Sequence, residues 1–250
     1  MSEAFRPVVL VPVYDHEGAI GAMVGAILRH PWPCLLVDDG SGPACATVLR
    51  ELAAAHPERV RLLRLPRNQG KGGAIMAGFT EAARLGYTHA LQIDADGQHD
   101  ADSLPQFAAL ACAQPAAMIC GQPVYDDTVP LGRKIGRYAT HVWVWINTLS
   151  FEIRDSMCGL RVYPLAAVTA LMRDVELGKR MEFDTEVLVH LVWRGVRVVN
   201  VPTRVTYPAD GVSHFDVWRD NVLISRMHAR LFFGMLWRLP RLLGRKVGLA

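Results

Sequence analysis

Leu91-Gln92-Ile93-Asp94-Ala95-Asp96-Gly97-Gln98-His99-Asp100 places two carboxylates, one residue apart, at the end of an apolar run. The run is typical of a buried strand, and at a strand end residues i and i+2 can point the same way. Two carboxylates hold a hard divalent ion weakly, because magnesium or manganese keeps several waters and shares phosphate oxygens with a substrate. The segment therefore predicts a metal site for a nucleotide diphosphate, although carboxylates at this spacing also cap turns.

The rest of the chain indicates an α/β fold around this segment. Apolar runs alternate with helical periods, and we expect strands at 8–13, 34–37 and 60–65 and helices at 18–29, 44–55, 71–85 and 102–112. The runs are continuously apolar, which favours a mostly parallel sheet flanked by helices on both faces. Such sheets bind ligands beyond the carboxyl ends of their strands. We expect one crevice there to gather three polar segments, Pro12-Val13-Tyr14, Asp38-Asp39-Gly40-Ser41 and Asp94-Ala95-Asp96.

The C-terminal segment differs in composition from the rest of the chain. We expect one domain over residues 1–214, because 250 residues with 51% hydrophobic content can build one large core. From Asn221 onward the sequence has no acidic residue, and its basic residues are Arg226, Arg230, Arg238, Arg241, Arg245 and Lys246. We expect 215–250 to form a basic amphipathic helix that Pro240 disturbs. This helix could lie in an anionic membrane interface or dock on its own domain.

The remaining composition narrows the class of protein. The five cysteines form no CxxC pair, so we expect reduced, mostly buried thiols rather than disulfides or a zinc site. The N-terminal sequence lacks the pattern of a secretory signal, and no window approaches about 20 uninterrupted apolar residues. A formal charge of +3 is too small to imply nucleic-acid binding. We therefore expect a cytoplasmic protein.

Seven motifs in order carry a resemblance to a known family. They are VPVYDHEG, LLVDDGSG, LPRNQGKGGA, LQIDADGQHD, DSMCGLRVYP, MEFDTEVL and VPTRVTYPADGVSHF. Together they resemble family 2 glycosyltransferases of the GT-A fold, closest to the dolichyl- or polyprenyl-phosphate sugar synthases, over residues 6–215. The resemblance implies an inverting, metal-dependent transfer from a nucleotide diphosphate-sugar to a membrane lipid.

The resemblance also assigns roles on the donor side. Pro12 and Tyr14 would border the nucleobase, and Asp39, with Asp38 beside it, would accept a hydrogen bond from the base or ribose. Lys71 follows small residues at a helix start and would face the charge of the nucleotide. The cofactor would be Mg²⁺ or Mn²⁺. The residues implied at the metal and the pyrophosphate are Asp94, Asp96, Gln98 and His214.

The acceptor side departs from the family pattern. The family places an arginine where this chain has Pro123, and a second arginine where it has Pro208. Arg133, Lys134 or Arg137 could compensate, and Arg133 best matches a basic position of the family. A lipid phosphate is already anionic and needs no base, whereas a hydroxyl or glycolipid acceptor requires one. The candidate bases are Asp155, Glu182 and Asp184.

Three further segments carry expectations about structure. Residues 122–132 are expected to be a loop, and 137–151 a helix buried on nearly all sides, whose tryptophans could alternatively meet a lipid. Arg161 is expected to brace its loop by pairing with a carboxylate. A peripheral enzyme on the cytoplasmic face of the membrane would accommodate both the tryptophans and the basic helix.

Other classes of protein remain open at this point. Asp94-Ala95-Asp96-Gly97 also resembles the nucleophile loop of haloacid-dehalogenase phosphatases. A sugar nucleotidyltransferase shares the general architecture, and a non-catalytic lipid-binding adaptor could keep the fold. Release of a nucleoside diphosphate would separate these alternatives from a glycosyltransferase.

Overall fold

The computed structural model describes residues 4–124, 131–205 and 215–246, with the backbone alone for 131–135. Its strands are β1 (Pro7–Val13), β2 (Cys34–Asp38), β3 (Val60–Arg64), β4 (His89–Gln92), β5 (Met118–Val124), β6 (Arg161–Pro164) and β7 (Val198–Arg204). Its α-helices are α1 (Glu17–Leu28), α2 (Pro43–Ala55), α3 (Lys71–Arg84), α4 (Leu104–Ala113), α5 (Leu131–Thr148), α6 (Leu165–Asp174), α7 (Phe183–Trp193) and α8 (Val217–Lys246). A short 3-10 helix, η1 (Ala101–Ser103), precedes α4.

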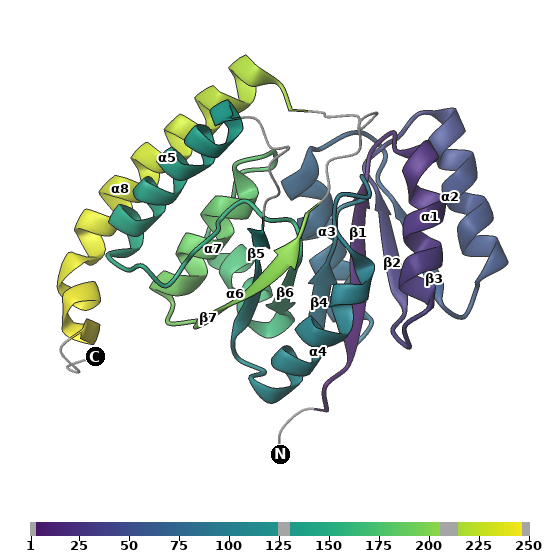
Figure 1. The fold of residues 1–250 in the computed structure, drawn as a ribbon, viewed down its shortest axis with the longest axis horizontal. Helices are drawn as coiled ribbons and strands as arrows, with labels where there is room; N and C mark the ends of the chain where they lie inside the picture. Colours follow the sequence, from purple (N-terminus) through teal and green to yellow (C-terminus); the bar gives the residue numbers. More distant parts are fainter. Residues whose placement is uncertain (1–3, 125–130, 206–214, 247–250) are drawn as a thin grey trace.

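Within the described residues the strands form one sheet in the order β3-β2-β1-β4-β6-β5-β7. Neighbouring strands are parallel except at β6, which runs antiparallel to both β4 and β5. The expected mostly parallel sheet is confirmed, and β6 is the reversed member. Because β1, β2 and β4 are parallel, their carboxyl ends meet at one edge of the sheet (Figure 1). We call this edge the donor edge.

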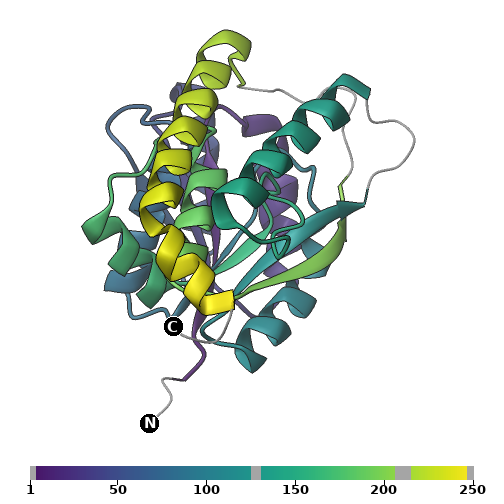
Figure 2. The ribbon, with the colours of Figure 1, turned by 90° about the vertical axis from the view of Figure 1, so that its left-hand side faces the viewer.

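Helices cover both faces of the sheet, as continuously apolar strands require. In β1, Val8 and Leu10 face one hydrophobic core while Val9, Val11 and Val13 face the other, since successive side chains alternate. Helices α1, α2 and α4 build the second core; α3, α6 and α7 build the first. Helices α5 and α8 form an outer layer packed on α7 and on each other, as Figure 2 shows from the side.

Helix α8 runs unbroken through Pro240, so the expected disturbance is wrong. Pro240 has no N–H group to donate to the carbonyl of Leu236. Both residues lie on the exposed side of the helix, where water can donate to that carbonyl instead. The opposite side docks on the domain, because Met227, Leu231 and Met235 belong to the first core. The proposed boundary at residue 214 stays a prediction.

The two segments around α5 differ from expectation. Strand β5 continues to Val124, because its second half pairs with β7, so the first part of 122–132 is strand rather than loop. Helix α5 is not buried on nearly all sides: the exposed fraction of Trp143 is 44% and that of Tyr138 is 61%. The reason is its outer-layer position, which leaves part of its surface without neighbours among the described residues.

The cysteines behave as packing residues. All five are free thiols, and Cys112 is the exposed one. Burial raises the pKa of the Cys34, Cys120 and Cys158 thiols to about 12. These buried side chains therefore stay neutral and unreactive at physiological pH.

Candidate active site

The turn after β2 is fixed by the buried carboxylate of Asp38. One oxygen accepts the N–H of Ser41 at 2.8 Å, and the other pairs with Arg64. Gly40 has a φ of 72°, and a Cβ there would lie 2.6 Å from the backbone of Arg67, so only glycine fits. The turn therefore packs directly against the loop that leads to α3.

Asp39 ties that loop to the donor edge. Its two carboxylate oxygens accept the backbone N–H groups of Gln69 at 2.7 Å and of Gly70 at 2.9 Å. Burial raises the pKa of Asp39, and these two hydrogen bonds moderate the rise. In this structure Asp39 orders the start of α3, and its contact with a base or ribose stays a prediction.

Lys71, at the start of α3, lies between two carboxylates. Its Nζ is 2.9 Å from Oδ2 of Asp94 and 2.9 Å from Oδ2 of Asp184. Burial alone would lower the pKa of Lys71, but Asp184 and Asp94 outweigh it and raise that pKa. The close approach of α3 to α7 depends on Gly72, whose Cβ would lie 2.4 Å from Phe183. Lys71 is thus a permanent cation held between β4 and α7.

The two aspartates after β4 have different environments. Burial would raise the pKa of Asp94, but Lys71 and His99, whose Nε2 lies 3.8 Å from Oδ2, outweigh it and lower that pKa. Burial and the charge of Asp94 raise the pKa of Asp96. Asp96 Oδ1 also accepts the N–H of Gln98 at 3.0 Å, so it caps the turn as the alternative interpretation expects. This cap engages one oxygen of Asp96.

The donor set suits a hard divalent cation. Oδ1 of Asp94 and Oδ1 of Asp184 are buried and have no hydrogen-bond partner among the described residues. Buried carboxylate oxygens without a donor favour a cation nearby. In the described part of the chain, however, no group of three or more His, Cys, Asp or Glu side chains could hold a metal alone. The unpaired oxygens of Asp94 and Asp184 do not make a complete set of metal ligands. They fit an ion that takes its remaining ligands from water and a diphosphate.

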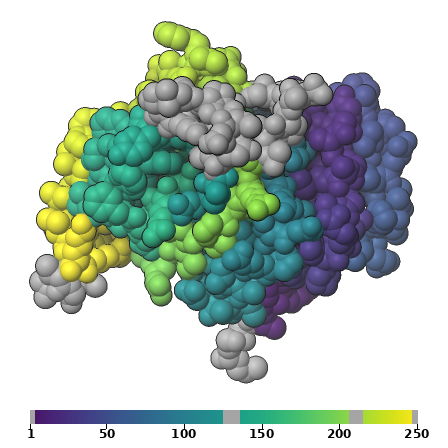
Figure 3. All heavy atoms as spheres, viewed as in Figure 1, coloured from purple at the N-terminus to yellow at the C-terminus, as the bar shows by residue number. Residues whose placement is uncertain are grey.

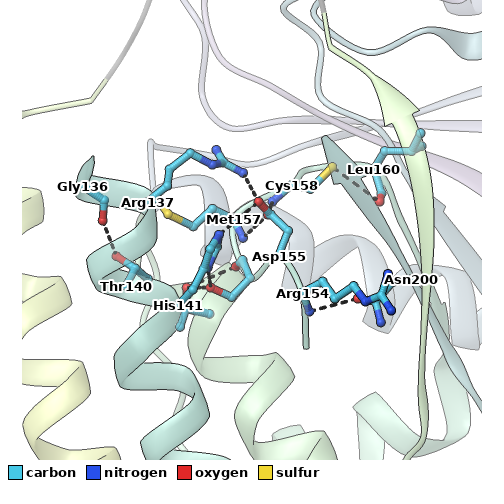
Figure 4. Close-up of polar contacts among 12 residues, drawn as sticks. Gly136, Arg137, Thr140, His141, Arg154, Asp155, Met157, Cys158, Leu160 and Asn200 are labelled. Atoms are coloured by element: carbon cyan, nitrogen blue, oxygen red, sulfur yellow. Dashed lines mark hydrogen bonds and ion pairs between the residues drawn. The ribbon is translucent and has the colours of Figure 1, made fainter. Parts of the chain in front are cut away.

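The loop between α5 and β6 packs against Asp94. A Cβ on Gly159 would lie 1.9 Å from Oδ2 of Asp94, so this position requires glycine. Asp155 shapes the loop, because its Oδ1 accepts the N–H groups of Met157 at 2.8 Å and Cys158 at 2.7 Å (Figure 4). The loop therefore sets the space on one side of Asp94.

The other oxygen of Asp155 anchors α5. Oδ2 lies 2.6 Å from the guanidinium of Arg137 and 3.3 Å from Nε2 of His141, both on α5 (Figure 4). Burial would raise the pKa of Asp155, but His141 and Arg137 outweigh it and lower that pKa well below its usual range. A carboxylate that binds protons so weakly is a poor general base. The structure therefore argues against Asp155 as a catalytic base and indicates that it positions the loop.

Arg161 braces the same loop, but the expectation of a carboxylate partner is wrong. Its buried guanidinium donates to the carbonyls of Cys158 at 2.7 Å and Asp184 at 2.5 Å. It also lies 3.3 Å from the hydroxyl of Tyr163. Arg161 begins β6, and its acceptors there are backbone carbonyls of the preceding loop and of the first turn of α7.

The structure brings some of the predicted site residues into direct contact, whereas others lie apart or outside the described residues. The structure brings Lys71, Asp94 and Asp184 into direct contact. Pro12 is buried inside β1 opposite Val37, and the half-buried Tyr14 follows that strand. His214 and the side chain of Arg133 lie outside the described residues, so their roles stay predictions.

Sequence reasoning missed three residues of this region, namely His99, His141 and Gly159. His99 lies inside the diagnostic segment, five positions after Asp94, but a single histidine in a loop carries no specific signal. His141 and Gly159 act through Asp155 and Asp94, which are distant in sequence. Nothing in one sequence marks such contacts.

The family of the chain follows from comparison with known proteins. Residues 8–175 match the family described as Glycosyl transferase family 2. The chain belongs to this family, and it is a family 2 glycosyltransferase. Membership decides against the phosphatase, nucleotidyltransferase and adaptor alternatives.

Two named relatives match most of the chain. A polyprenol monophosphomannose synthase of Mycolicibacterium smegmatis is 28% identical over 83% of this chain and 80% of the relative. An undecaprenyl-phosphate mannosyltransferase of Micrococcus luteus is 27% identical over 79% of this chain and 82% of the relative. The sequence relatives of this chain thus include transferases named for polyprenyl phosphates.

Solved structures share the fold at low sequence identity. Glucosyl-3-phosphoglycerate synthase of Mycobacterium tuberculosis, in complex with Mn²⁺ and UDP-glucose, has a TM-score of 0.66 and 12% identity, with 92% of this chain and 78% of that chain covered. A mannosyltransferase of Pyrobaculum calidifontis, in complex with GDP-mannose and Mn²⁺, has a TM-score of 0.59 and 16% identity, with 97% and 74% covered. These neighbours confirm the expected GT-A fold.

Proposed function

We propose that this glycosyltransferase moves a sugar from a nucleotide diphosphate-sugar to a membrane lipid, with polyprenyl phosphate as the acceptor. The observation that carries the proposal is the cluster of Asp94, Asp96 and Lys71 at the donor edge. Two carboxylates and a fixed cation there can bind a metal and the charge of a diphosphate. The names of the polyprenyl-phosphate relatives support the choice of acceptor.

The donor is proposed to bind along the ends of β1, β2 and β4. Tyr14 and Pro12 would border the base, and Asp38 and Asp39 would face the base or ribose. The two structural neighbours that hold UDP-glucose and GDP-mannose support a nucleotide-sugar donor of this kind. They do not choose between uridine and guanosine, because one of each is present.

Mg²⁺ or Mn²⁺ is proposed to bind at Asp94 and Asp96, with Gln98 beside them. When bound, the ion acts as a Lewis acid and stabilises charge on the leaving diphosphate. Lys71 keeps Asp94 ionised and fixed in place, since the two charges lie 2.9 Å apart. The neighbours in complex with Mn²⁺ support a divalent ion without choosing between the two metals.

The choice of a phosphate as acceptor rests on how few carboxylates of this region could act as a general base. A phosphate oxygen is already anionic and can attack the anomeric carbon directly. The new bond from oxygen to carbon forms as the bond to the diphosphate breaks, so the electron pair leaves with the nucleoside diphosphate and the configuration inverts. Arg133 is proposed to hold the lipid phosphate. Asp155, with its lowered pKa and four hydrogen-bonding partners, is unsuited to activate a hydroxyl.

A lipid hydroxyl or glycolipid is the second candidate acceptor. Glu182 is buried, and its Oε2 has no hydrogen-bond partner among the described residues. It is the remaining carboxylate of the three proposed bases, because Asp184 is paired with Lys71. Transfer to polyprenol but not to polyprenyl phosphate would favour this alternative.

The site of action is proposed to be the cytoplasmic face of an anionic membrane, where the enzyme would bind peripherally. Among the described helices, none is long and apolar enough to cross a bilayer. A lipid acceptor nevertheless has to be reached at the membrane surface.

The first test is calorimetric binding of UDP and GDP, each with Mn²⁺ and with chelator. We expect one nucleotide to bind only with the metal, and Asp96→Asn to reduce turnover about 10²–10³-fold or more. Asp100→Asn, an exposed change four residues away, is the matched control and should leave binding unchanged. Unaltered turnover in Asp96→Asn would contradict the metal assignment. Separate transfer assays with polyprenyl phosphate and with polyprenol identify the acceptor.

A further inference from the structure

Helix α8 carries a second apolar surface that faces away from the domain. Its inward side supplies Met227, Leu231, Met235 and Leu242 to the core. On the other side, apolar residues recur every three to seven positions, as one face of a helix requires. This outer stripe consists of Trp218, Val222, Ala229, Phe233, Leu236 and Leu243. Trp218 is 82% exposed and Phe233 is 70% exposed, so nothing in the described chain covers the centre of the stripe.

The outer stripe continues onto α5. The ring of Trp143 meets Phe232 of α8 edge to face, with centroids 6.2 Å apart, and remains partly exposed. Ile146, one turn further along α5, is exposed as well. Helices α5 and α8 lie side by side on one flank of the molecule, where they form a continuous surface (Figures 2 and 3).

Arginines border the outer stripe along one margin. Arg219, Arg226 and Arg241 are exposed and project about a quarter to a third of a turn from the stripe, if the helix advances about 100° per residue. Trp237, the most exposed tryptophan of α8 at 85%, lies on the same margin. After Asp220 the sequence contains no acidic residue. An apolar strip with a tryptophan and a purely basic margin complements a surface of anionic lipid headgroups.

We propose that the outer stripe of α8, extended by Trp143, is the surface with which this protein binds an anionic bilayer, with α8 lying in the plane of the interface. The inference rests on the proposed lipid acceptor and specifies where the membrane contacts the chain. The helix has 30 residues, so it presents about 45 Å of contact. A second copy of the chain is a poorer occupant, because α8 offers the arginines of its partner no carboxylate beyond Asp220.

The docking of α8 connects this surface to the donor edge. Asp220, fully buried in the first turns of α8, pairs with Arg180 at 2.9 Å. Arg180 and Lys179 pack on Gly70, where a Cβ would meet them at 2.9 and 2.4 Å, and the Lys179 carbonyl accepts the N–H of Gly73. The first turn of α8 is therefore joined through Arg180 to the residue that precedes Lys71, which suits transfer to a lipid.

The test is co-sedimentation with vesicles that contain neither polyprenyl phosphate nor nucleotide sugar. We expect the protein to bind phosphatidylcholine vesicles that contain about 30% phosphatidylglycerol better than vesicles of pure phosphatidylcholine. Binding to the anionic vesicles should weaken as the salt concentration rises. Phe233→Ser with Leu236→Ser should weaken binding about tenfold or more, whereas Phe233→Leu should retain it. Arg241→Gln should weaken binding to the anionic vesicles about fivefold.

Arg50→Gln removes an exposed charge from α2, across the sheet, and should change vesicle binding little. Circular dichroism and thermal unfolding should match those of wild type in every variant, which shows that each is folded. Equal sedimentation of wild type and the double serine variant would overturn the proposal. So would a concentration-dependent dimer that Phe233→Ser dissociates, since the stripe would then join two copies. Because the vesicles carry no acceptor, failure of the proposed glycosyl transfer would leave this result intact.

Discussion

The donor edge and the flank formed by α5 and α8 hold their polar groups in different ways. At the donor edge, Asp39 and Lys71 are bound by backbone groups or opposite charges within a few residues of strand ends. On the flank, α5 is anchored through Asp155 to the loop before β6, and several aromatic side chains remain exposed. The comparison shows that polar contacts order the donor edge, whereas α5 and α8 are held mainly by apolar packing on the domain and by a few ion pairs.

The contact of Gly159, in the loop that Asp155 ties to α5, with Asp94 of the donor edge offers the strongest test of this comparison. Gly159→Ala would place a Cβ 1.9 Å from Oδ2 of Asp94, so the carboxylate or the loop must move. We expect metal-dependent nucleotide binding to weaken about 10–100-fold, as for other changes next to a metal ligand. Calorimetry measures this directly. Gly21→Ala, in an open position of α1, should leave binding unchanged and raise stability by up to about 1 kcal/mol.

A substitution of Asp155 measures how much its contacts with α5 contribute to the free energy of unfolding. Asp155→Asn removes a buried charge from Arg137 and should cost about 3 kcal/mol of unfolding free energy at neutral pH. The folded pKa of Asp155 is lowered, so its stabilising effect is complete above the unfolded value and disappears as pH falls through the folded one. Denaturant titrations should therefore show wild type and variant converging in acid.

The exposed pair of Asp174 and Arg194 supplies the control for this measurement. Asp174→Asn should cost less than about 1 kcal/mol, since surface ion pairs contribute little. A loss for Asp155→Asn no larger than this would mean that the flank does not depend on the Asp155 contacts.

The smallest expected effect concerns the contact between α5 and α8. His228 lies near Asn147 of α5, and burial lowers its pKa from 6.5 to about 4. A lowered histidine pKa stabilises the fold above pH 6.5 and loses that contribution as pH falls toward 4. We expect His228 to account for about 1 kcal/mol at most of the stability lost between pH 7.5 and 5.5, so His228→Gln should lose that much less than wild type. Burial also lowers the pKa of His190 to about 4, and His190 contributes equally in both proteins. The exposed change His56→Gln should reproduce the wild-type profile.

The donor edge was predictable because its signals are local. Each strand ends in polar residues that follow directly in sequence, so the parallel arrangement alone places Asp38, Asp39 and Asp94 together. The reversed strand β6 was not predicted, because four residues carry no mark of direction. The partners of Arg161 were misjudged for a related reason: the carbonyls of Cys158 and Asp184 come within its reach only once the chain is folded.

The sequence by itself determined the α/β class, the family and the donor edge with its paired aspartates, because strand periodicity and short motifs act over neighbouring residues. Only the tertiary structure decided that Asp94 shares Lys71 with Asp184, that Gly159 packs on Asp94, and that Asp155 binds α5. It also decided which of the two apolar sides of α8 joins the core. Such contacts join residues far apart in the chain, and a sequence pattern shows that a side is apolar without showing what covers it.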